Sequence, residues 1–420
     1  MPSHVTAVEQ PTDAATAPQP TAIILGAHIA ALGTLRRLTD QGVPCQVLDD
    51  TTDIITHSRW YRPTARRLAE TDDSAALAEH LEGLPVERAV VIPCSDTWTL
   101  AVSGLPELTR ERFMASVPPR STVEQLVDKR RFRELVDRVG LPHPRTAVIR
   151  EPADLDQVSD LELTDGFLKP IDSQLHNRHY GTKGHFVHSR GEAERMVRDA
   201  AARGITFLFQ EWIPGGPART ILLDGFVDAG GSMRGILARR RVRMHPPRIA
   251  NTTHDVTIPL AEVEPAVEHT RRLFGSIPYR GVFNIEFKED PRDGEFRVIE
   301  LNPRPFWLIA HTAAAGLDLP QMVYRDAQGL PVPEVTAYAV GRHGIYELPE
   351  IRALVSAWSA LRRPDGPVIG PWLRGDHILL SRRDPMPAVA AVWNAASRRA
   401  ATAVGRGRPA PGGTVGERAT

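Results

Sequence analysis

The sequence predicts a protein of mixed α/β and α+β class that begins with a doubly wound parallel sheet. Two observations carry this prediction. Residues 21–49 follow the order strand, glycine, helix, strand, which is the βαβ unit that opens such a sheet. Residues 281–302 hold two strand-like runs around the turn sequence Glu-Asp-Pro-Arg-Asp-Gly, which favours an antiparallel hairpin.

Composition limits the number of domains and the classes of partner. A chain of 420 residues is too long for one hydrophobic core, so two or three domains are expected. Lys+Arg and Asp+Glu are both 51, and this zero net charge gives no reason to expect a nucleic-acid or membrane partner. Cys45 and Cys94 form neither a disulfide framework nor a zinc motif, which fits a cytoplasmic setting. No apolar run could span a bilayer, and we expect no signal peptide.

The N-terminal elements are predicted in chain order. Residues 1–20 are rich in Ala, Thr and Pro and are expected to be disordered. Strand and helix patterns then alternate, which is typical of an open α/β sheet. The predicted elements are strands at 21–25, 45–49 and 89–93, and a helix at 29–41.

Polar residues near these strands are candidates for ligand binding, but they do not identify the ligand. The first turn lacks the G-x-G-x-x-G fingerprint, so a dinucleotide-dependent enzyme is weakly supported. Ser95 and Asp96 follow a strand at the edge where open sheets bind ligands, but capping of a helix explains them equally well. Arg59 and Tyr61 are further candidates for binding a substrate carboxylate, with surface pairing as the alternative.

The second half of the chain carries the most informative pattern. Glu286 and Glu300 lie inside apolar runs, where an ionised carboxylate must be paired, neutralised or bound to metal. Strand alternation places Asn284 beside Glu286 on one face, and Asn302 beside Glu300. Two carboxylates and a carboxamide suit Mg²⁺, which takes oxygen ligands and completes its shell with water and phosphate. The alternative is a solvated edge hairpin.

The position of Lys169 favours phosphate binding. Lys169 ends the apolar strand 167–170, where its compact charge suits phosphate oxygens, although a surface lysine is the alternative.

Two further segments near Lys169 are predicted from their patterns. Residues 128–140 predict a charged helix closed by Gly140 and followed by an extended linker. The four histidines of 176–188 are interpreted as ordinary strand and loop residues rather than zinc ligands.

These motifs together resemble the ATP-grasp superfamily. The family's metal site is a Glu on one strand and a Glu-x-Asn on the next, followed by an Arg, which match Glu286, Glu300, Asn302 and Arg304. The helix opening with Asp-Lys and the linker Gly-Leu-Pro-x-Pro-x-Thr are similar to the entry of the ATP-grasp domain. The narrower resemblance is to bacterial carboxylate–amine ligases, including D-aspartate-ligase-like and peptide-ligase-like members.

The resemblance implies a domain order and a nucleotide site. The implied order is a disordered 1–20, a pre-ATP-grasp domain at 21–120, an ATP-grasp domain at 121–330 with lobes 121–206 and 207–330, a C-terminal extension at 331–395 and a disordered tail at 396–420. The implied ATP-binding residues are Lys169, the glycine-rich lid Gly181, Lys183 and Gly184, and the hinge residues Gln210, Glu211, Trp212 and Ile213. No ribose ligand can be assigned.

The resemblance also implies the chemistry. An ATP-dependent ligase would activate a carboxylate as an acylphosphate and form a C–N bond to an amine or amino acid, releasing ADP and phosphate. The implied cofactors are ATP and two Mg²⁺ ions, with Mn²⁺ as the other suitable metal. Arg304 and Arg241 are the implied catalytic residues, with a solvated face as the alternative for Arg241. The alternatives are a non-catalytic nucleotide-binding protein and a ligase with a thiol acceptor. The expected partners are small-molecule substrates, with a homodimer as the default assembly.

Overall fold

A computed structural model describes residues 19–51, 53–182, 184–246 and 251–406. The chain forms three sheets, two of four strands and one of seven. The predicted lead at 1–20 lies almost entirely outside the described residues. Within the described part, no helix is long and apolar enough to cross a membrane.

The N-terminal sheet is parallel and has the strand order β2-β1-β3-β4. The apolar strand residues of β1 are fully buried, because helices cover the sheet on both faces. This sheet is the predicted doubly wound unit. Its elements are β1 (Thr21–Leu25), α1 (Ile29–Asp40), β2 (Cys45–Leu48), α2 (Ser74–Glu82), β3 (Ala89–Pro93), α3 (Asp96–Ser103), α4 (Glu107–Arg112) and β4 (Phe113–Met114).

The second sheet is a small antiparallel lobe with the order β5-β8-β6-β7. The predicted lobe boundary at 206/207 is wrong, because β8 pairs with β5 and β6 in this sheet and belongs to the smaller lobe. An apolar run shows that a strand exists but does not show which sheet it joins. The elements are β5 (Thr146–Ile149), β6 (Gly166–Pro170), α7 (Ser173–Tyr180), β7 (His185–Val187), α8 (Arg190–Ala201) and β8 (Phe207–Glu211).

The seven-stranded sheet forms the larger lobe and has the order β13-β12-β9-β10-β11-β14-β15. Helices α5, α6 and α9 share a buried apolar core with it. Its elements are α5 (Arg120–Val127), α6 (Lys129–Val139), β9 (Thr220–Val227), β10 (Met233–His245), β11 (Asn251–Ile258), α9 (Glu264–Gly275), β12 (Gly281–Glu289), β13 (Phe296–Asn302), β14 (His343–Ile345) and β15 (Asp376–His377).

The segment after β13 ties the N-terminal sheet to the larger lobe. Helices α10 (Ile309–Ala315) and α11 (Leu319–Ala327) pack against α1, and the buried core that results also includes residues of β9 and β10. The end of the β12–β13 hairpin is therefore held directly against the first domain.

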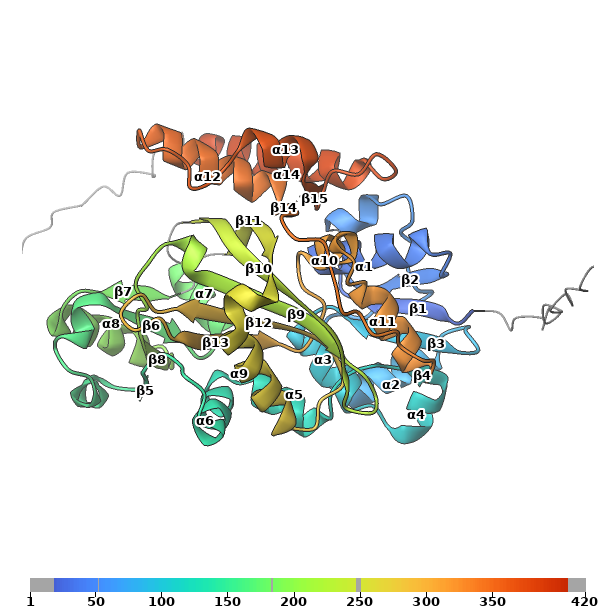
Figure 1. Cartoon of the computed structure of the whole chain (residues 1–420), viewed down its shortest axis with the longest axis horizontal. Helices are drawn as coiled ribbons and strands as arrows, with labels where there is room; N and C mark the ends of the chain where they lie inside the picture. Colours follow the sequence, from blue (N-terminus) through green and yellow to red (C-terminus); the bar gives the residue numbers. More distant parts are fainter. Residues whose placement is uncertain (1–18, 52, 183, 247–250, 407–420) are drawn as a thin grey trace, which may run out of the picture.

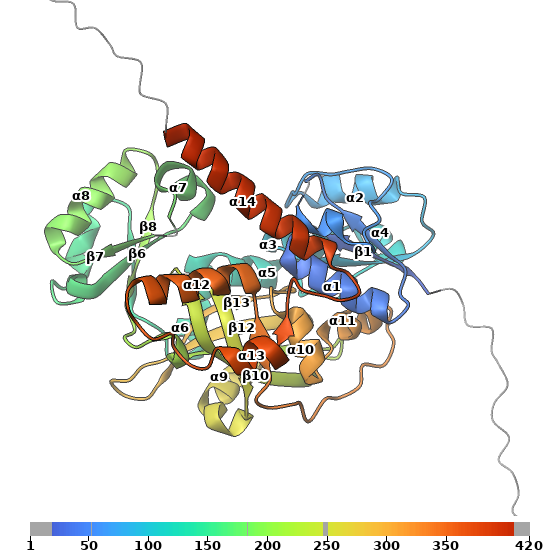
Figure 2. The ribbon, with the colours of Figure 1, turned by 90° about the horizontal axis from the view of Figure 1, so that it is seen from above.

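The C-terminal helices lie in one layer (Figures 1 and 2). They are α12 (Glu347–Ser359), α13 (Ile369–Arg374) and α14 (Met386–Arg406). In this layer, α12 packs against β10 and β11 of the seven-stranded sheet, and α14 packs against residues 54–57 of the first domain. The expected disordered tail from 396 is corrected here, because α14 continues through 406. Alanine and arginine dominate 395–406, and both are strong helix formers. The other domain boundaries stay predictions.

Candidate functional site

The β12–β13 hairpin brings the predicted carboxylates together. Glu286 pairs with Glu300 across the two strands, and Asn284 pairs with Asn302. The amide of Asn302 donates a hydrogen bond to Asn284 Oδ1 at 3.1 Å. Ile285 is fully buried on the opposite face, so alternation leaves the polar side chains on one side.

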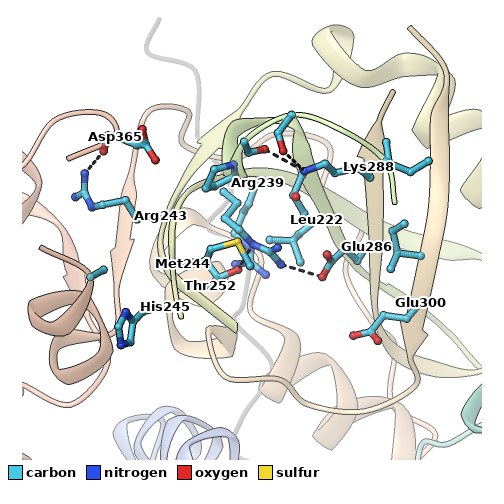
Figure 3. A pocket seen from close by; sticks show the side chains of 18 of the residues that line it. Leu222, Arg239, Arg243, Met244, His245, Thr252, Glu286, Lys288, Glu300 and Asp365 are labelled. Atoms are coloured by element: carbon cyan, nitrogen blue, oxygen red, sulfur yellow. Dashed lines mark hydrogen bonds and ion pairs between the residues drawn. The ribbon is translucent and has the colours of Figure 1, made fainter. Parts of the chain in front are cut away.

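A cavity of about 820 Å³ lies over this polar face. Residues of both lobes and of the C-terminal layer form its walls. The hairpin residues Glu286 and Glu300 lie at one end of the cavity, and Asp365 lies at the other (Figure 3). Among the described lining residues there are nine lysines and arginines against four aspartates and glutamates. Such a surplus of positive charge favours an anionic ligand.

Three lysines surround the carboxylate end. Lys169 Nζ lies 3.8 Å from Glu300 Oε2. Lys129 was not assigned a role from the sequence, yet it lines the same cavity and donates to the carbonyl of Pro170 at 2.7 Å. Burial, reinforced by the charge of Lys169, lowers the pKa of Lys129 to about 8.

Lys288 is a second cavity residue that the sequence analysis did not single out. It lies two residues beyond Glu286, so strand alternation could have placed it on the same face. Its ammonium group donates to the carbonyls of Gly215 and Gly216 at 3.0 and 3.1 Å. Burial and the nearby Arg241 lower the pKa of Lys288 to about 8.

The predicted hinge residues line the same cavity. These residues are Gln210, Glu211, Trp212 and Ile213. Glu211 is held in place, because its carboxylate pairs with Arg292 at 2.6 Å and accepts a hydrogen bond from the backbone of Arg145 at 3.2 Å. Trp212 makes an edge contact with Phe186, with ring centroids 4.9 Å apart.

The two glycines of the predicted lid lie between helix α7, which ends at Tyr180, and strand β7, which begins at His185. A side chain at Gly184 would meet Phe167 at 2.5 Å, and the φ angle of +155° also favours glycine. Neither Gly181 nor Gly184 lines the cavity. Lys183 lies outside the described residues.

Three arginines at alternate positions of β10 have different partners. Arg239 is buried against Asp224 and Asp255, which accept hydrogen bonds from its guanidinium group. Arg241 donates to Glu286 Oε2 at 2.9 Å and to Thr252 Oγ1 at 2.8 Å. The third arginine, Arg243, turns toward the C-terminal layer (Figure 3). The alternative of a solvated face is wrong for Arg241, because its side chain is only 6% exposed.

Arg304 connects the hairpin to the first domain. It donates to Asp96 Oδ1 at 2.7 Å and to Asn302 Oδ1 at 3.1 Å. Burial opposes the charged form, but Asp96 outweighs it and raises the pKa of Arg304. Ser95 caps α3 by accepting the backbone N–H of Trp98 at 3.1 Å.

The remaining candidates lie away from the cavity. The backbone of Arg59 donates to Asp384 at 2.9 Å, and the hydroxyl of Tyr61 donates to Asp49 at 3.4 Å. Neither residue lines the cavity, so their proposed role in acid binding has no support. In the described part of the chain, no group of three His, Cys, Asp or Glu side chains could hold a metal ion by itself.

Sequence comparisons give two related proteins and no matching family model. The chain is 26% identical over 248 residues to D-aspartate ligase from Enterococcus faecium, covering 57% of this chain and 59% of that protein. It is 24% identical over 271 residues to the C-terminal section of the carbamoyl phosphate synthase large chain from Methanopyrus kandleri, covering 60% and 46%. The matched region therefore spans less than two thirds of each relative.

Solved structures share the fold. N5-carboxyaminoimidazole synthetase from Staphylococcus aureus, complexed with ADP, has a TM-score of 0.62 at 12% identity and covers 82% of this chain and 90% of its own. The biotin carboxylase domain dimer of 2-oxoglutarate carboxylase from Hydrogenobacter thermophilus, in complex with MgADP, has a TM-score of 0.59 at 14% identity, with coverages of 77% and 73%. The chain therefore shares the fold of these nucleotide-complexed enzymes, and over part of its length its sequence is similar to D-aspartate ligase, in agreement with the resemblance of its motifs to the ATP-grasp superfamily.

Proposed function

We propose that this protein is an ATP-dependent ligase that activates a carboxylate and joins it to an amine. The observation that carries the proposal is the pairing of Glu286 with Glu300 at one end of a cavity lined mostly by cations. Such a site suits a metal-bound polyphosphate, because the metal needs carboxylates while the phosphate oxygens need positive charge. The similarity to D-aspartate ligase supports the same conclusion.

The donor set at this end fits Mg²⁺. Glu286, Glu300 and Asn302 offer oxygen atoms on one face of the hairpin, and Mg²⁺ binds few protein ligands and shares the rest of its shell with phosphate and water. Glu300 is half exposed, so its carboxylate is accessible from the cavity. When bound, Mg²⁺ would neutralise charge on the phosphate oxygens. The number of ions and the choice between Mg²⁺ and Mn²⁺ stay predictions.

The protein's own groups would bind the rest of the nucleotide. Lys129, Lys169 and Lys288 supply positive charge to phosphate oxygens around the carboxylates. Residues 210–213 contribute backbone groups and side chains to the cavity wall, where the adenine ring would lie. The role of the glycine turn at 181–184 stays a prediction.

Two chemical steps follow from this arrangement. A substrate carboxylate oxygen forms a bond to the γ-phosphorus, the bond to the bridging oxygen breaks, and ADP leaves. The amine nitrogen then bonds to the acyl carbon, phosphate leaves, and the amine loses a proton. Arg241 contacts Glu286 and Arg304 contacts Asn302, and from these positions the two arginines would stabilise developing negative charge.

The substrates, a homodimer and a cytoplasmic setting belong to the proposal and are not needed for its test. The two cysteines are unpaired, which supports a reducing compartment. Residues of the smaller lobe and of the hairpin line the cavity, and Asp96 of the first domain accepts a hydrogen bond from the lining residue Arg304.

The proposal is tested by ADP release in the presence of ATP, Mg²⁺ and mixtures of carboxylic acids and amino acids. We expect substrate-dependent ADP release by the wild type and a loss of about 10²- to 10³-fold for Glu300→Gln. Glu295→Gln is the matched control, because Glu295 is an exposed residue of the same hairpin outside the cavity. Equal background release by wild type and Glu300→Gln across a broad panel would refute the ligase activity.

A further inference from the structure

The cavity continues well beyond the carboxylate end. Its far part, here called the C-terminal compartment, lies between the end of β10 and the C-terminal layer (Figure 3). In the order of the sheet, strand β9 lies between the hairpin and β10. The compartment is lined by Met244 and His245 of β10, by Trp307, and by residues of the segment 353–365.

Arg243 fixes the C-terminal wall of this compartment to the sheet. Its Nε donates to Glu350 on α12 at 2.6 Å, and Nη2 donates to the carbonyl of Pro367 at 3.0 Å. A further hydrogen bond reaches the backbone carbonyl of Asp365. Glu350 is fully buried and also accepts from Thr253 at 2.7 Å. Arg243 therefore anchors the wall from 353 to 365 at both ends.

The inner face of α12 leaves room for a ligand. Ala353, Ser356, Ala357 and Ala360 recur at the helical spacing of three and four residues, so they share one face. All four side chains are small, and all line the cavity. The space between this face and β10 is therefore part of the cavity and is not filled by core side chains.

The charges at this end are suited to an anion. Neither Arg362 nor Arg363 has a side-chain hydrogen bond or an ion pair with another described residue. Both side chains are exposed at the cavity, and Asp365 is the single acidic residue of the described compartment lining. Two available guanidinium groups bind carboxylate or phosphate oxygens well, because their N–H donors match the geometry of such groups.

We propose that the C-terminal compartment binds a carboxylate or phosphate group of the second substrate, remote from its reacting amine. This inference rests on the proposed ligase function, since it assigns the two ends of one cavity to two substrates. The nucleotide occupies the hairpin end. Arg362 and Arg363 then hold the anionic group of the acceptor, and the small face of α12 accommodates its body.

The binding test uses the full-length protein with the hairpin end saturated by ADP and Mg²⁺. Glutarate, tricarballylate and inorganic phosphate are titrated separately by calorimetry, so that carboxylate and phosphate preferences are distinguished. We expect at least one anion to bind, and the double variant Arg362→Ala/Arg363→Ala to weaken that binding by about 10- to 100-fold. Arg374→Ala is the matched control, because Arg374 is an exposed arginine of the same layer outside the cavity.

The outcomes separate this inference from the proposed function. Binding of ADP without binding of any anion, or anion binding that the double variant leaves unchanged, overturns the compartment and leaves the ligase proposal intact. A double variant that weakens ADP as much as the anion also overturns it, because the arginines would then serve the nucleotide. A wild type that binds no ADP overturns both.

Turnover gives a second readout once an acid and amine pair supports ADP release. We expect the double variant to raise KM for the amine by about 10- to 100-fold while KM for ATP stays unchanged. The variant Arg362→Lys/Arg363→Lys should restore most of the affinity, because positive charge is kept. A variant that changes kcat and leaves the KM for the amine unaltered contradicts the assignment.

Discussion

The two ends of the cavity differ in how the chain builds them. At the hairpin end, Glu286 and Glu300 come from neighbouring strands, and strand register alone places them together. At the far end, Arg243 and Glu350 are 107 residues apart in sequence. A site built from local structure can be recognised from residue spacing, whereas a site built by docking a distant helix cannot.

The arginines of β10 show the same contrast within one strand. Arg239 is enclosed by two aspartates and serves the fold, while Arg241 contacts a carboxylate in the cavity. Arg243 holds a helix from the C-terminal layer. Since their spacing and residue type are identical, only the partners distinguish a structural arginine from a functional one.

The largest expected effect is on catalysis at the hairpin end. Arg241→Met should lower kcat by about 10³-fold, because a positive charge next to the transferred phosphoryl group is lost. Arg240→Met is the control, since Arg240 pairs with Glu262 at 3.1 Å on the partly exposed side of the strand. Steady-state ADP release measures both. If the two variants lose activity equally, the contrast between neighbouring positions of β10 is wrong.

The next effect is on stability at the far end. Glu350→Gln leaves the buried Arg243 without a charged partner on α12, which should lower the free energy of unfolding by about 3 kcal/mol. Arg352→Ala, at an exposed position of α12, should change it by less than about 0.5 kcal/mol. Denaturant unfolding measures both. A Glu350→Gln protein as stable as the control would show that Arg243 does not anchor the layer.

This contrast also explains how much could be predicted from the sequence. The first sheet and the carboxylate hairpin were predicted because hydrophobic periodicity and turn residues are local signals. The place of β8 was missed because a strand's partners are set by tertiary packing. Lys129 lines the cavity, and Asp96 accepts a hydrogen bond from Arg304. Neither contact could be predicted, because each joins segments that are far apart in the sequence.

The pH dependence of nucleotide binding tests the lysines of the hairpin end. Burial lowers the pKa of Lys129 and of Lys288 to about 8 in the free protein. Phosphate oxygens favour the charged lysine, so bound nucleotide raises these values. Affinity should therefore be greatest below pH 8 and fall as pH rises above it, by about tenfold per pH unit for each lysine involved.

Calorimetry with ADP and Mg²⁺ from pH 7 to 9.5 measures this effect. Lys129→Arg/Lys288→Arg is the matched variant, because arginine stays charged throughout this range. We expect the slope above pH 8 to disappear in the variant. An unchanged slope would mean that groups other than these two lysines set the pH dependence.

The smallest expected effect concerns the turn that closes the hairpin. Asp290 is buried and pairs with Arg297 at 2.9 Å, while hydrogen bonds from Arg292 hold the pKa of its carboxyl well below its usual range. Asp290→Asn should cost about 1 kcal/mol at pH 7, since both arginines keep other acidic partners. The carboxylate stabilises the fold above the unfolded pKa of about 4, and this contribution is lost as pH falls below it.

Denaturant unfolding at pH 7 and at pH 3 measures the turn's contribution, with Glu295→Gln as the exposed control in the same hairpin. The difference between wild type and Asp290→Asn should shrink at pH 3, because the wild-type carboxylate then begins to lose its advantage over the neutral amide. The Asp290→Asn protein should still bind ADP, since strand pairing and not the turn sets the Glu286 to Glu300 register. Loss of ADP binding together with a change of about 1 kcal/mol in stability would mean that the hairpin end depends on its turn as strongly as the far end depends on the Arg243 anchor.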